Sequence, residues 1–303
     1  MIDFQKFDTA KRDDYNRYLL HCGERGCEYS FANLNMWGKQ RGAFVADRLA
    51  LFSQFDRLSV YPYPIGQGAL QPVLEAIFQD ARERGIVCRL TGLTAADCAD
   101  LEVLYPGQFR IHPDRSGCDY VYKIDDLADL AGKKFQKKRN HVNKFDLTHP
   151  HCQALPMTPD LLPAVQEMVD AWYESRLAKE SKDDFQMERT ALKRAFAHMD
   201  DYGIEGLVLV DDGRILAMTM GSPLTEDTFD IHFEKAREDV DGAYAAINRA
   251  FARYLREKYP QLRYLNREDD MGLPGLRKAK LSYNPDHLIE KFWASPVEAD
   301  DED

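Results

Sequence analysis

The two halves of the chain follow one order of predicted secondary-structure elements, and this repeat limits the folds that the chain can adopt. In the second half, apolar residues recur at helical spacing on both sides of three strand-like runs. The Asp211-Asp212-Gly213 turn between two of these runs is typical of a β-hairpin. The predicted elements of this half are a strand at residues 152–157, helices near 158–172 and 191–199, a hairpin at 207–220, a third strand at 228–234, a helix at 243–258 and strands at 262–265 and 288–293.

The first half of the chain shows the same order of predicted elements. Its predicted elements are a strand at residues 4–7, helices at 13–20 and 31–37, a hairpin at 43–52, a third strand at 58–61, a helix at 70–84 and strands at 87–90 and 120–122, followed by a bridging helix at 124–145. This is the layout of the GNAT (N-acetyltransferase) fold. We therefore predict an α+β protein with two tandem GNAT-like domains, each a mixed, mostly antiparallel sheet flanked by helices. The expected boundaries are residues 1–145, ending in the bridging helix, and 146–303, carrying the candidate site.

Composition is that of a folded protein. The 303 residues are 44% hydrophobic and 11% aromatic, and no apolar run approaches the roughly 18 residues that a membrane span needs. The first residues have neither a basic region nor an apolar signal core, so we expect a cytoplasmic protein without an integral membrane segment. Six scattered cysteines without a CxxC pair favour reduced thiols. A net charge of −11 argues against broad, non-specific binding of nucleic acid.

One short segment carries metal-ligand residue types. His149, His151 and Cys152 lie close together, but Pro150 interrupts them and no second cluster accompanies them. A loop is therefore favoured over a metal site, and we expect no metal and no required cofactor.

The C-terminal run from residue 264 to residue 285 is the first candidate site. A strand leads into Asn266, Glu268 and Asp269, and ligands gather at strand ends in α/β sheets. Glu268 or Asp269 could act as a general base toward an amine if burial raises its pKa. The same acids could instead pair with the cations that follow and only shape the loop.

Three cations follow the turn in this run. On a helix, Arg277 and Lys280 would share a face that Lys278 does not. A fixed cation such as Lys280 can stabilise the tetrahedral oxyanion of acyl transfer, and Arg277 is suited to a forked grip on phosphate or carboxylate. The alternative is a solvated cationic helix end. Glu234 and His232 alternate on the third strand and could line the same cleft, although a lone histidine on a strand is more often structural.

A basic segment is the second candidate. Residues 133–144 hold six Lys or Arg residues and no acid, on an acidic chain. Its candidate anion-binding residues are Lys138, Arg139, Asn140 and His141. A face of this kind could hold phosphates by charge, including those of a tRNA acceptor end. The alternative is a domain-bridging helix whose cations pair with acids elsewhere.

Together the two segments resemble a bacterial family of tandem GNAT proteins related to the catalytic domain of phosphatidylglycerol lysyltransferases (lysylphosphatidylglycerol synthases), and more distantly Fem-type aminoacyltransferases. The shared signature is a glycine, a lysine flanked by an aromatic residue, and a second aromatic three residues on. Gly275, Lys280 and Tyr283 match it, and Ala279 replaces the first aromatic. The resemblance implies aminoacyl-tRNA as donor, and a lipid headgroup or peptidoglycan precursor as acceptor. The membrane-spanning half of the lipid synthases has no counterpart here, which weakens a lipid acceptor.

The loop before each half's central helix bears on coenzyme A. GNAT enzymes that use acetyl-CoA place a glycine-rich turn there, so that N–H groups of the helix N-terminus cradle the pyrophosphate. In the second half Asp239, Asp241 and Tyr244 depart from that pattern, whereas the first half keeps Gly66 and Gly68. A tight turn alone would also explain those two glycines.

The sequence thus favours an acyltransferase that moves an acyl or aminoacyl group to an amine or hydroxyl of a small molecule or lipid headgroup. In this interpretation Lys280 stabilises the oxyanion, Glu268 or Asp269 is the base, and Asn266, Tyr283 and the cations bind the substrates. A non-catalytic ligand-binding module is the main alternative. An acetyl-CoA-dependent N-acetyltransferase, with acyl-CoA as donor, is the second.

Overall fold

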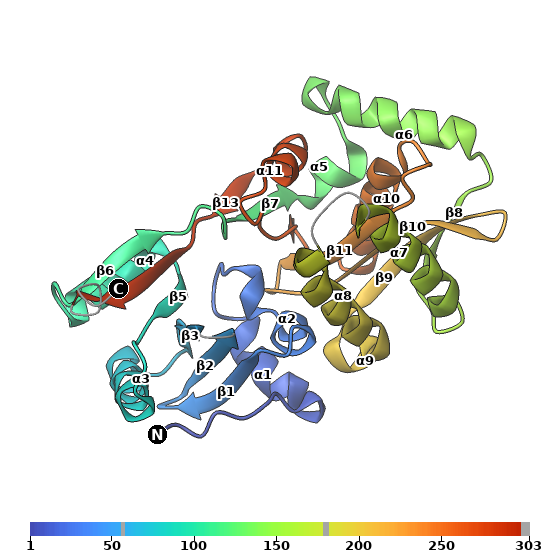
Figure 1. Cartoon of the computed structure of the whole chain (residues 1–303). Coiled ribbons are helices and arrows are strands. Elements are labelled where there is room, and N and C mark those ends of the chain that lie inside the picture. The colour runs from blue at the N-terminus through green and yellow to red at the C-terminus, as the bar shows by residue number, and fades with distance from the viewer. Residues whose placement is uncertain (56–57, 178–181, 298–303) are drawn as a thin grey trace.

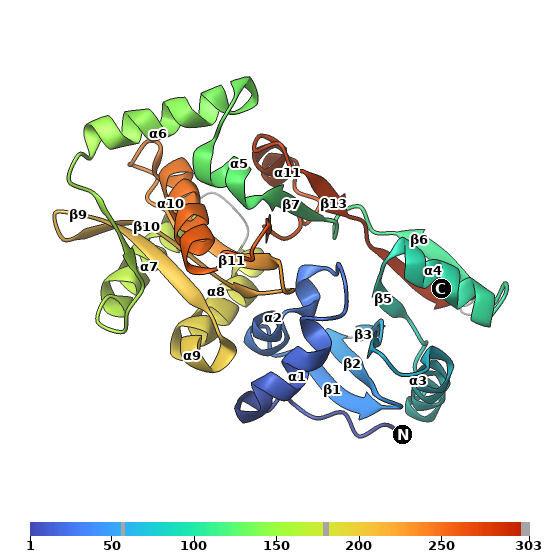
Figure 2. The same ribbon diagram turned by 180° about the vertical axis from the view of Figure 1, so that it is seen from behind.

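The computed structural model describes residues 1–55, 58–177 and 182–297 and forms two lobes, each built on one sheet (Figure 1). The N-terminus and the last strand, β14 (Phe292–Pro296), both lie on the N-terminal lobe (Figure 1). Helices of the C-terminal lobe lie on both faces of its sheet, with α10 on one side and α7 and α8 on the other (Figures 1 and 2).

The N-terminal lobe opens with helices and continues with an antiparallel sheet. Leucines and aromatic residues make its core, as the helical spacing at residues 70–84 predicts: Val73, Leu74 and Ile77 are fully buried, and Gly85 ends that helix in the left-handed conformation (φ 67°). The elements of this lobe are η1 (Thr9–Lys11), α1 (Arg12–Leu19), η2 (Cys27–Tyr29), α2 (Phe31–Met36), β1 (Gln40–Val45), β2 (Arg48–Phe55), β3 (Leu58–Pro62), β4 (Ile65–Gly66), α3 (Leu70–Arg84), β5 (Leu90–Leu93), α4 (Ala95–Leu104) and β6 (Phe109–Pro113).

The remaining elements form the C-terminal lobe and the crossings between lobes. They are β7 (Asp119–Lys123), α5 (Ile124–Asp129), η3 (Lys133–Phe135), α6 (Gln136–Thr148), β8 (Gln153–Pro156), α7 (Leu162–Leu177), α8 (Lys182–Ala197), α9 (Met199–Tyr202), β9 (Glu205–Asp211), β10 (Arg214–Pro223), β11 (Thr228–Ala236), α10 (Ala243–Lys258), β12 (Tyr264–Asn266), α11 (Pro274–Leu281), β13 (His287–Ile289) and β14 (Phe292–Pro296).

The two sheets repeat one topology. The strand orders are β1-β2-β3-β5-β14-β6, with β4 beside β2, and β8-β9-β10-β11-β12-β7-β13. In each sheet, one pair of strands is parallel and is joined through a helix: β3 and β5 through α3, and β11 and β12 through α10. The repeat of element order that the sequence predicts is therefore present in the sheets.

The lobes exchange one strand each. β7 comes from the first half of the chain but pairs with β12 and β13 in the second sheet. In return β14, near the C-terminus, lies between β5 and β6 in the first sheet. Each sheet is thus completed by the other half of the chain, and the connecting segments pass through the junction of the lobes. The division at residue 145 remains a prediction, and the sheets cross it.

Several predicted elements differ from the structure. The expected strand at residues 4–7 is an isolated β-bridge between Gln5 and Gly42, and the strand expected at 87–90 begins at Leu90. The expected bridging helix at residues 124–145 is interrupted between α5 and α6, because Leu130 (φ 50°) and Gly132 (φ 79°) adopt left-handed conformations there. The expected strand at residues 288–293 is two strands in different sheets, β13 and β14, because the chain leaves one sheet and enters the other at Glu290 and Lys291. An apolar run in the sequence cannot reveal such a change of sheet.

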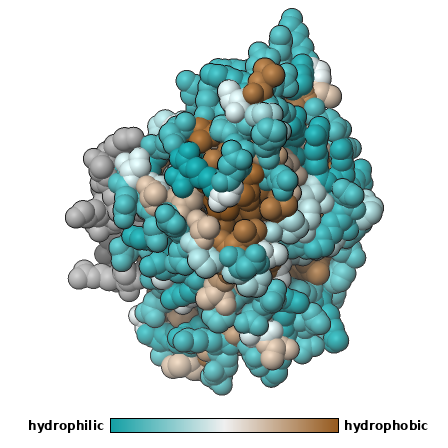
Figure 3. All heavy atoms as spheres, turned by 90° about the vertical axis from the view of Figure 1, so that its right-hand side faces the viewer, coloured by the Kyte–Doolittle hydropathy of each residue, from teal (hydrophilic) through white to brown (hydrophobic). Residues whose placement is uncertain are grey.

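Much of the surface on one face of the molecule is polar (Figure 3). On the face that Figure 3 shows, hydrophilic side chains surround a central patch of hydrophobic ones. The core of the C-terminal sheet also includes Ala32 and Met36 of α2, which pack with residues of α7 and α8. The N-terminal lobe therefore contributes apolar contacts to the C-terminal one, which fixes the junction between them.

Candidate functional site

Lys280 lies at the centre of the C-terminal run. It projects from α11, and its ammonium donates to the backbone carbonyls of Arg267 and Glu268, the second at 3.3 Å. The hydroxyl of Tyr122 donates to the carbonyl of Lys280 itself at 2.8 Å. Burial and the nearby Arg267 guanidinium both lower the pKa of Lys280. The ammonium is thus fixed by main-chain dipoles and not by an acid side chain.

Arg277 shares the inward face of α11 with Lys280, while Lys278 is exposed, as the helical spacing predicts. Its guanidinium makes a two-bond contact with Asp270, at 2.7 and 2.9 Å. Tyr120 also donates to Asp270, at 2.6 Å. These bonds, above all that from Arg277, hold the pKa of Asp270 well below its usual range. In this arrangement Arg277 shapes the loop before α11.

The acids after β12 differ in environment. The Asn266 amide donates to Asp119 at 2.9 Å, and its oxygen accepts the backbone N–H of Glu268 at 2.7 Å. Glu268 has a left-handed backbone (φ 57°), an uncommon conformation that these contacts maintain. Burial raises the pKa of Asp269 to about 6, with Lys291 opposing the shift.

Lys138 joins this region from α6. Its ammonium lies 3.6 Å from the centre of the Tyr283 ring, and the Arg267 guanidinium lies 4.7 Å from the same centre. Arg267 pairs with Glu234 at 2.9 Å. Burial, together with the positive charge of Arg267, lowers the pKa of Lys138 to about 8. We call Lys138, Arg267 and Lys280 the cationic cluster.

The other candidates on α6 point elsewhere. The Arg139 guanidinium donates to the carbonyls of Leu130 and Gly132, the second at 2.6 Å, and so closes the turn before its own helix. Asn140 is exposed. His141 lies 3.8 Å from Asp241. Of the four candidates on this helix, the structure brings only Lys138 to Tyr283 and Arg267.

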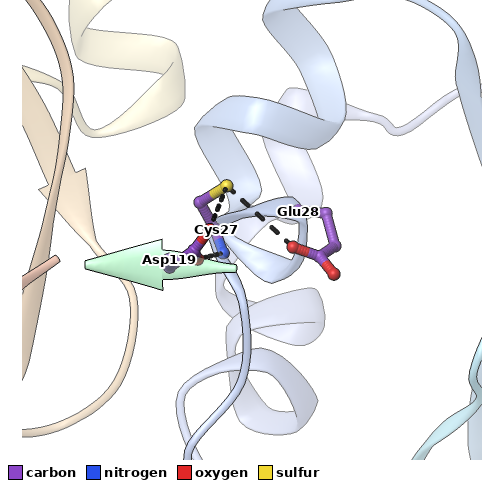
Figure 4. Close-up of side chains that lie close together, drawn as sticks. All are labelled: Cys27, Glu28 and Asp119. Atoms are coloured by element: carbon purple, nitrogen blue, oxygen red, sulfur yellow. Dashed lines mark hydrogen bonds between the residues drawn. The ribbon is translucent and has the colours of Figure 1, made fainter. Parts of the chain in front are cut away.

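A second lysine at the junction has acidic neighbours. The ammonium of Lys291 bonds Glu28 at 2.6 Å and Asp119 at 2.8 Å, and lies 3.9 Å from the sulfur of Cys27. Figure 4 shows how Cys27 and Glu28 of the N-terminal lobe meet Asp119 at the start of β7. Burial alone would lower the pKa of Lys291, but Asp119, Cys27 and Glu28 raise it well above its usual range. This lysine-bearing acid cluster joins both lobes.

A cavity of about 890 Å³ opens at another part of the junction, with α1 and α9 on its walls. Ser222 contributes to its lining, and the Ser222 hydroxyl lies 2.8 Å from Nε2 of His232. The cavity therefore reaches β10, which lies next to the strand that carries His232 and Glu234.

The turn before α10 is covered. A Cβ on Gly242 would lie 2.4 Å from the carbonyl oxygen of His141, so α6 packs against the N-terminus of α10. Lys144 of α6 also pairs with Asp241 there, at 2.6 Å. A pyrophosphate at this helix end would have to displace α6 and lie beside Asp241.

The glycines of the first half have a packing role. A Cβ on Gly68 would lie 2.0 Å from the carbonyl oxygen of Ala46, and Gly66 adopts a φ of 136°. The two residues fit closely against the β1–β2 turn, and Arg48 donates to the carbonyl of Gly68 at 2.7 Å. The close approach accounts for both glycines.

The segment at residues 149–152, for which the sequence favours a loop over a metal site, contacts the C-terminal sheet. Nδ1 of His149 lies 2.7 Å from Asp211, in the turn of the β9–β10 hairpin. His149 therefore fastens the end of α6 to the C-terminal sheet.

The fold defines a class of protein: two GNAT-like units in one chain, with charged side chains clustered where they meet. The chain belongs to the family described as phosphatidylglycerol lysyltransferase, C-terminal, whose model matches residues 21–295. The family and fold are those of acyl and aminoacyl transferases in general. No helix in the described ranges is long and apolar enough to cross a membrane.

Solved structures agree with this assignment. A conserved protein of unknown function from Bacteroides thetaiotaomicron is 36% identical, with a TM-score of 0.93 over 98% of this chain and 100% of that one. The L-PGS of Bacillus licheniformis is 16% identical, with a TM-score of 0.72 over 98% and 94%. FemX (10% identical, TM-score 0.65, 99% and 98%) and a tandem GNAT protein from the clavulanic acid biosynthesis pathway (10% identical, TM-score 0.52, 98% of each) share the fold.

A curated relative matches over part of its length. An uncharacterized protein of Mycoplasmoides gallisepticum is 22% identical over 183 residues, which are 60% of this chain and 57% of that protein. The chain thus aligns with little more than half of that relative.

Sequence reasoning missed the residues that the strand exchange brings to the junction. These are Cys27, Glu28, Asn33, Asp119, Asp230 and Lys291. One signal was available for Lys291, since a lysine inside an otherwise apolar strand pattern suggests a buried partner. For the others, the sequence carries no sign of which halves meet.

Proposed function

We propose that this chain transfers an acyl or aminoacyl group from a phosphate-bearing donor to an amine or hydroxyl acceptor at the cationic cluster. The observation that carries the proposal is the half-buried Lys280, whose ammonium is held by two backbone carbonyls and has no acid partner among the described residues. An ammonium has three N–H donors, so one remains for a ligand. The family assignment supports the same chemistry.

Lys280 is assigned the role of oxyanion stabiliser. When the acceptor attacks the donor carbonyl, the electron pair moves onto the carbonyl oxygen, and a fixed cation in a dry site lowers the energy of that state. Carbonyl dipoles hold the ammonium in place without neutralising it. The intermediate then collapses, the carbonyl re-forms, and the donor's alcohol or thiol leaves with a proton.

Asp269 is the better candidate for the base. Its pKa near 6 leaves it ionised at neutral pH, and close enough to neutrality to accept the acceptor's proton. The Glu268 carboxylate is already engaged, 3.1 Å from both His232 and the amide of Asn33. Asn266 orients this loop.

The donor's phosphate is assigned to Lys138 and Arg267. Nη1 of Arg267 is buried and has no hydrogen-bond partner among the described residues, although a buried guanidinium donor is costly to leave unpaired. A phosphate oxygen would satisfy it, with Lys138 alongside and Tyr283 below. An aminoacyl-tRNA end offers such a phosphate, and a lipid headgroup is a candidate acceptor. Arg277 already bonds Asp270, and Arg139 already bonds backbone carbonyls, so neither is assigned to the phosphate.

Coenzyme A is the less favoured donor. The helix end that would hold its pyrophosphate is covered by α6 and faces Asp241. The glycines of the first half are explained by packing against the β1–β2 turn.

The test compares Lys280→Ala with Lys278→Ala, an exposed lysine on the same helix. Each protein is incubated with radiolabelled aminoacyl-tRNA or acetyl-CoA and with phosphatidylglycerol or small amines. We expect product from aminoacyl-tRNA in the wild type and in Lys278→Ala, and a loss of about 10²–10³ in turnover for Lys280→Ala. Equal turnover in Lys280→Ala would reject the assigned role. Donor binding without product under every condition would instead support the binding module.

A further inference from the structure

A second acid-rich cluster lies at the junction, and no lysine or arginine among the described residues pairs with it. His232 on β11 presents Nδ1 to Glu268 at 3.1 Å and to Asp230 at 3.4 Å. Asp230 and the side chain of His232 are fully buried, and the Glu268 side chain is 21% exposed. We call these three residues the acid–histidine cluster. Their ligand atoms all lie within 4.8 Å of one another.

The lysine-bearing acid cluster shows how buried carboxylates at this junction are compensated by a cation. There, Glu28 and Asp119 receive the ammonium of Lys291, so the protein supplies the cation itself. Within the described ranges, no Lys or Arg lies within ion-pair distance of Asp230 or Glu268. One oxygen of Asp230 is also buried without a hydrogen-bond partner there. Two carboxylates that face each other in a buried site repel unless a proton or a cation lies between them.

We propose that the acid–histidine cluster binds one divalent transition-metal ion of the zinc type, through Nδ1 of His232 and one oxygen each of Asp230 and Glu268. Zinc takes nitrogen and carboxylate ligands at about 2.0–2.2 Å in tetrahedral geometry, which separates neighbouring ligand atoms by roughly 3.3–3.6 Å. The observed separations of 3.1 and 3.4 Å from Nδ1 are close to that spacing. Three protein ligands leave a fourth position for water or a substrate atom.

The surrounding residues match the outer partners of a metal site. Ser222 lies 2.8 Å from Nε2 of His232 and can accept its proton, which leaves the Nδ1 lone pair for the ion. The amide nitrogen of Asn33, which donates to the carbonyl of Cys27 at 2.8 Å, also lies 3.2 Å from Asp230 and 3.1 Å from Glu268, so its second N–H points toward the two carboxylates. Trp37 in turn donates to the oxygen of Asn33 at 3.0 Å.

The ligand set also indicates which ions to expect. Imidazole favours zinc and its neighbours in the first transition row, whereas an all-oxygen site would favour magnesium or calcium. Glu268 is the ligand nearest to solvent and offers the entry path. The cluster includes neither Lys280 nor Asp269, so its metal binding can be measured without the transfer reaction.

The experiment uses the full chain after treatment with EDTA. Equilibrium dialysis against Zn²⁺ and against Mg²⁺, followed by elemental analysis, measures ions per chain, and the visible spectrum of the Co²⁺ form reports the coordination. We expect one Zn²⁺ per chain, little Mg²⁺, and a tetrahedral Co²⁺ spectrum without a thiolate band. Ser222→Ala should weaken binding by about 10–100-fold. Glu268→Gln, at the partly exposed ligand, should weaken it further.

Cys27→Ser is the matched control, because it alters the lysine-bearing acid cluster and leaves the acid–histidine cluster intact. We expect it to retain full zinc binding. The proposal is overturned if the wild type binds no ion, in which case a proton holds the carboxylates together. It is also overturned if Glu268→Gln and Asp230→Asn both bind zinc normally, or if Cys27→Ser abolishes binding. Circular dichroism of each variant separates loss of a ligand from loss of the fold.

Discussion

Lys280 and Lys291 lie close together in the sequence and both lie at the junction, Lys280 half-buried and Lys291 buried, but their surroundings have opposite effects on their pKa values. Around Lys291, Glu28 and Asp119 compensate the cost of burial and raise its pKa. The ammonium of Lys280 bonds two backbone carbonyls and, among the described residues, no acid side chain, and burial lowers its pKa. One lysine is part of a complete ion-pair network, whereas the other retains charge that a ligand could use.

This difference assigns a structural role to Lys291 and a ligand-binding role to Lys280 at the same junction. A buried charge with complete partners holds elements together, and here it fastens β7 to the segment between β13 and β14. A buried charge with incomplete partners costs free energy in the free protein, and that cost is recovered when a ligand of opposite charge arrives. The same physical argument distinguishes the lysine-bearing acid cluster from the acid–histidine cluster.

The largest expected effect is on stability, from Lys291→Met. Removing this ammonium leaves Asp119 buried without its partner, and breaking one side of a buried pair typically costs about 3–5 kcal/mol. Urea denaturation should show this loss, while the exposed Lys278→Met should change the free energy of unfolding very little. A loss well below 1 kcal/mol for Lys291→Met would mean that Asp119 finds another partner, and the contrast between the two lysines would then fail.

The next effect is on the rate, from Asp269→Asn. If Asp269 accepts the acceptor's proton, its loss should reduce turnover by about 10² or more. In the wild type, turnover should rise as the pH increases through about 6, because Asp269 loses its proton there. The exposed Asp160→Asn is the control and should keep the wild-type profile. An unchanged rate and profile in Asp269→Asn would assign the base elsewhere.

The smallest effect concerns Lys138. Its pKa near 8 means that the ammonium loses its charge as the pH rises through 8, so pyrophosphate binding to the wild type should weaken over that range. Lys138→Met should bind about tenfold more weakly, roughly 1.4 kcal/mol, and lose this pH dependence. Lys137→Met, at the exposed neighbouring position, should bind as the wild type does. Calorimetric titration measures both.

The same lysine gives a stability signal of defined sign. Between pH 8 and the unfolded pKa of about 10.5, the unfolded chain binds the proton that folded Lys138 has lost. The free energy of unfolding should therefore rise with pH across this window because of Lys138, and Lys138→Met should lack that contribution. A wild-type dependence that persists in the variant would show that another group is responsible.

Local elements were predictable because their signals are local. Short windows of sequence contain the periodic apolar residues of α3 and α10 and the Asp-Asp-Gly turn between β9 and β10. The repeated element order follows from adding such local predictions along the chain. The predictions were wrong where two local conformations were equally compatible with the pattern. Leu130 and Gly132 break a helix that apolar spacing alone would continue, and Lys291 marks a change of sheet inside an apolar run.

The candidate site was predictable only in part. The signature lysine and the acids after β12 stand out by their residue types, and Lys138 stands out by the charge of its segment. Their partners do not. Asp119 and Asp230 meet the C-terminal run because β7, β11 and β12 lie in one sheet, which no spacing in the sequence encodes.

The sequence by itself determined the class of fold, the repeat, and the two segments whose charges exceed what folding requires. The tertiary structure decided which charges are compensated. The exchange of β7 and β14 between the sheets gives Lys291 its acids, whereas the ammonium of Lys280 bonds backbone carbonyls. The physical reason is that charge compensation acts over a few ångströms in space, and segments far apart in the chain come that close only after the two halves have folded together.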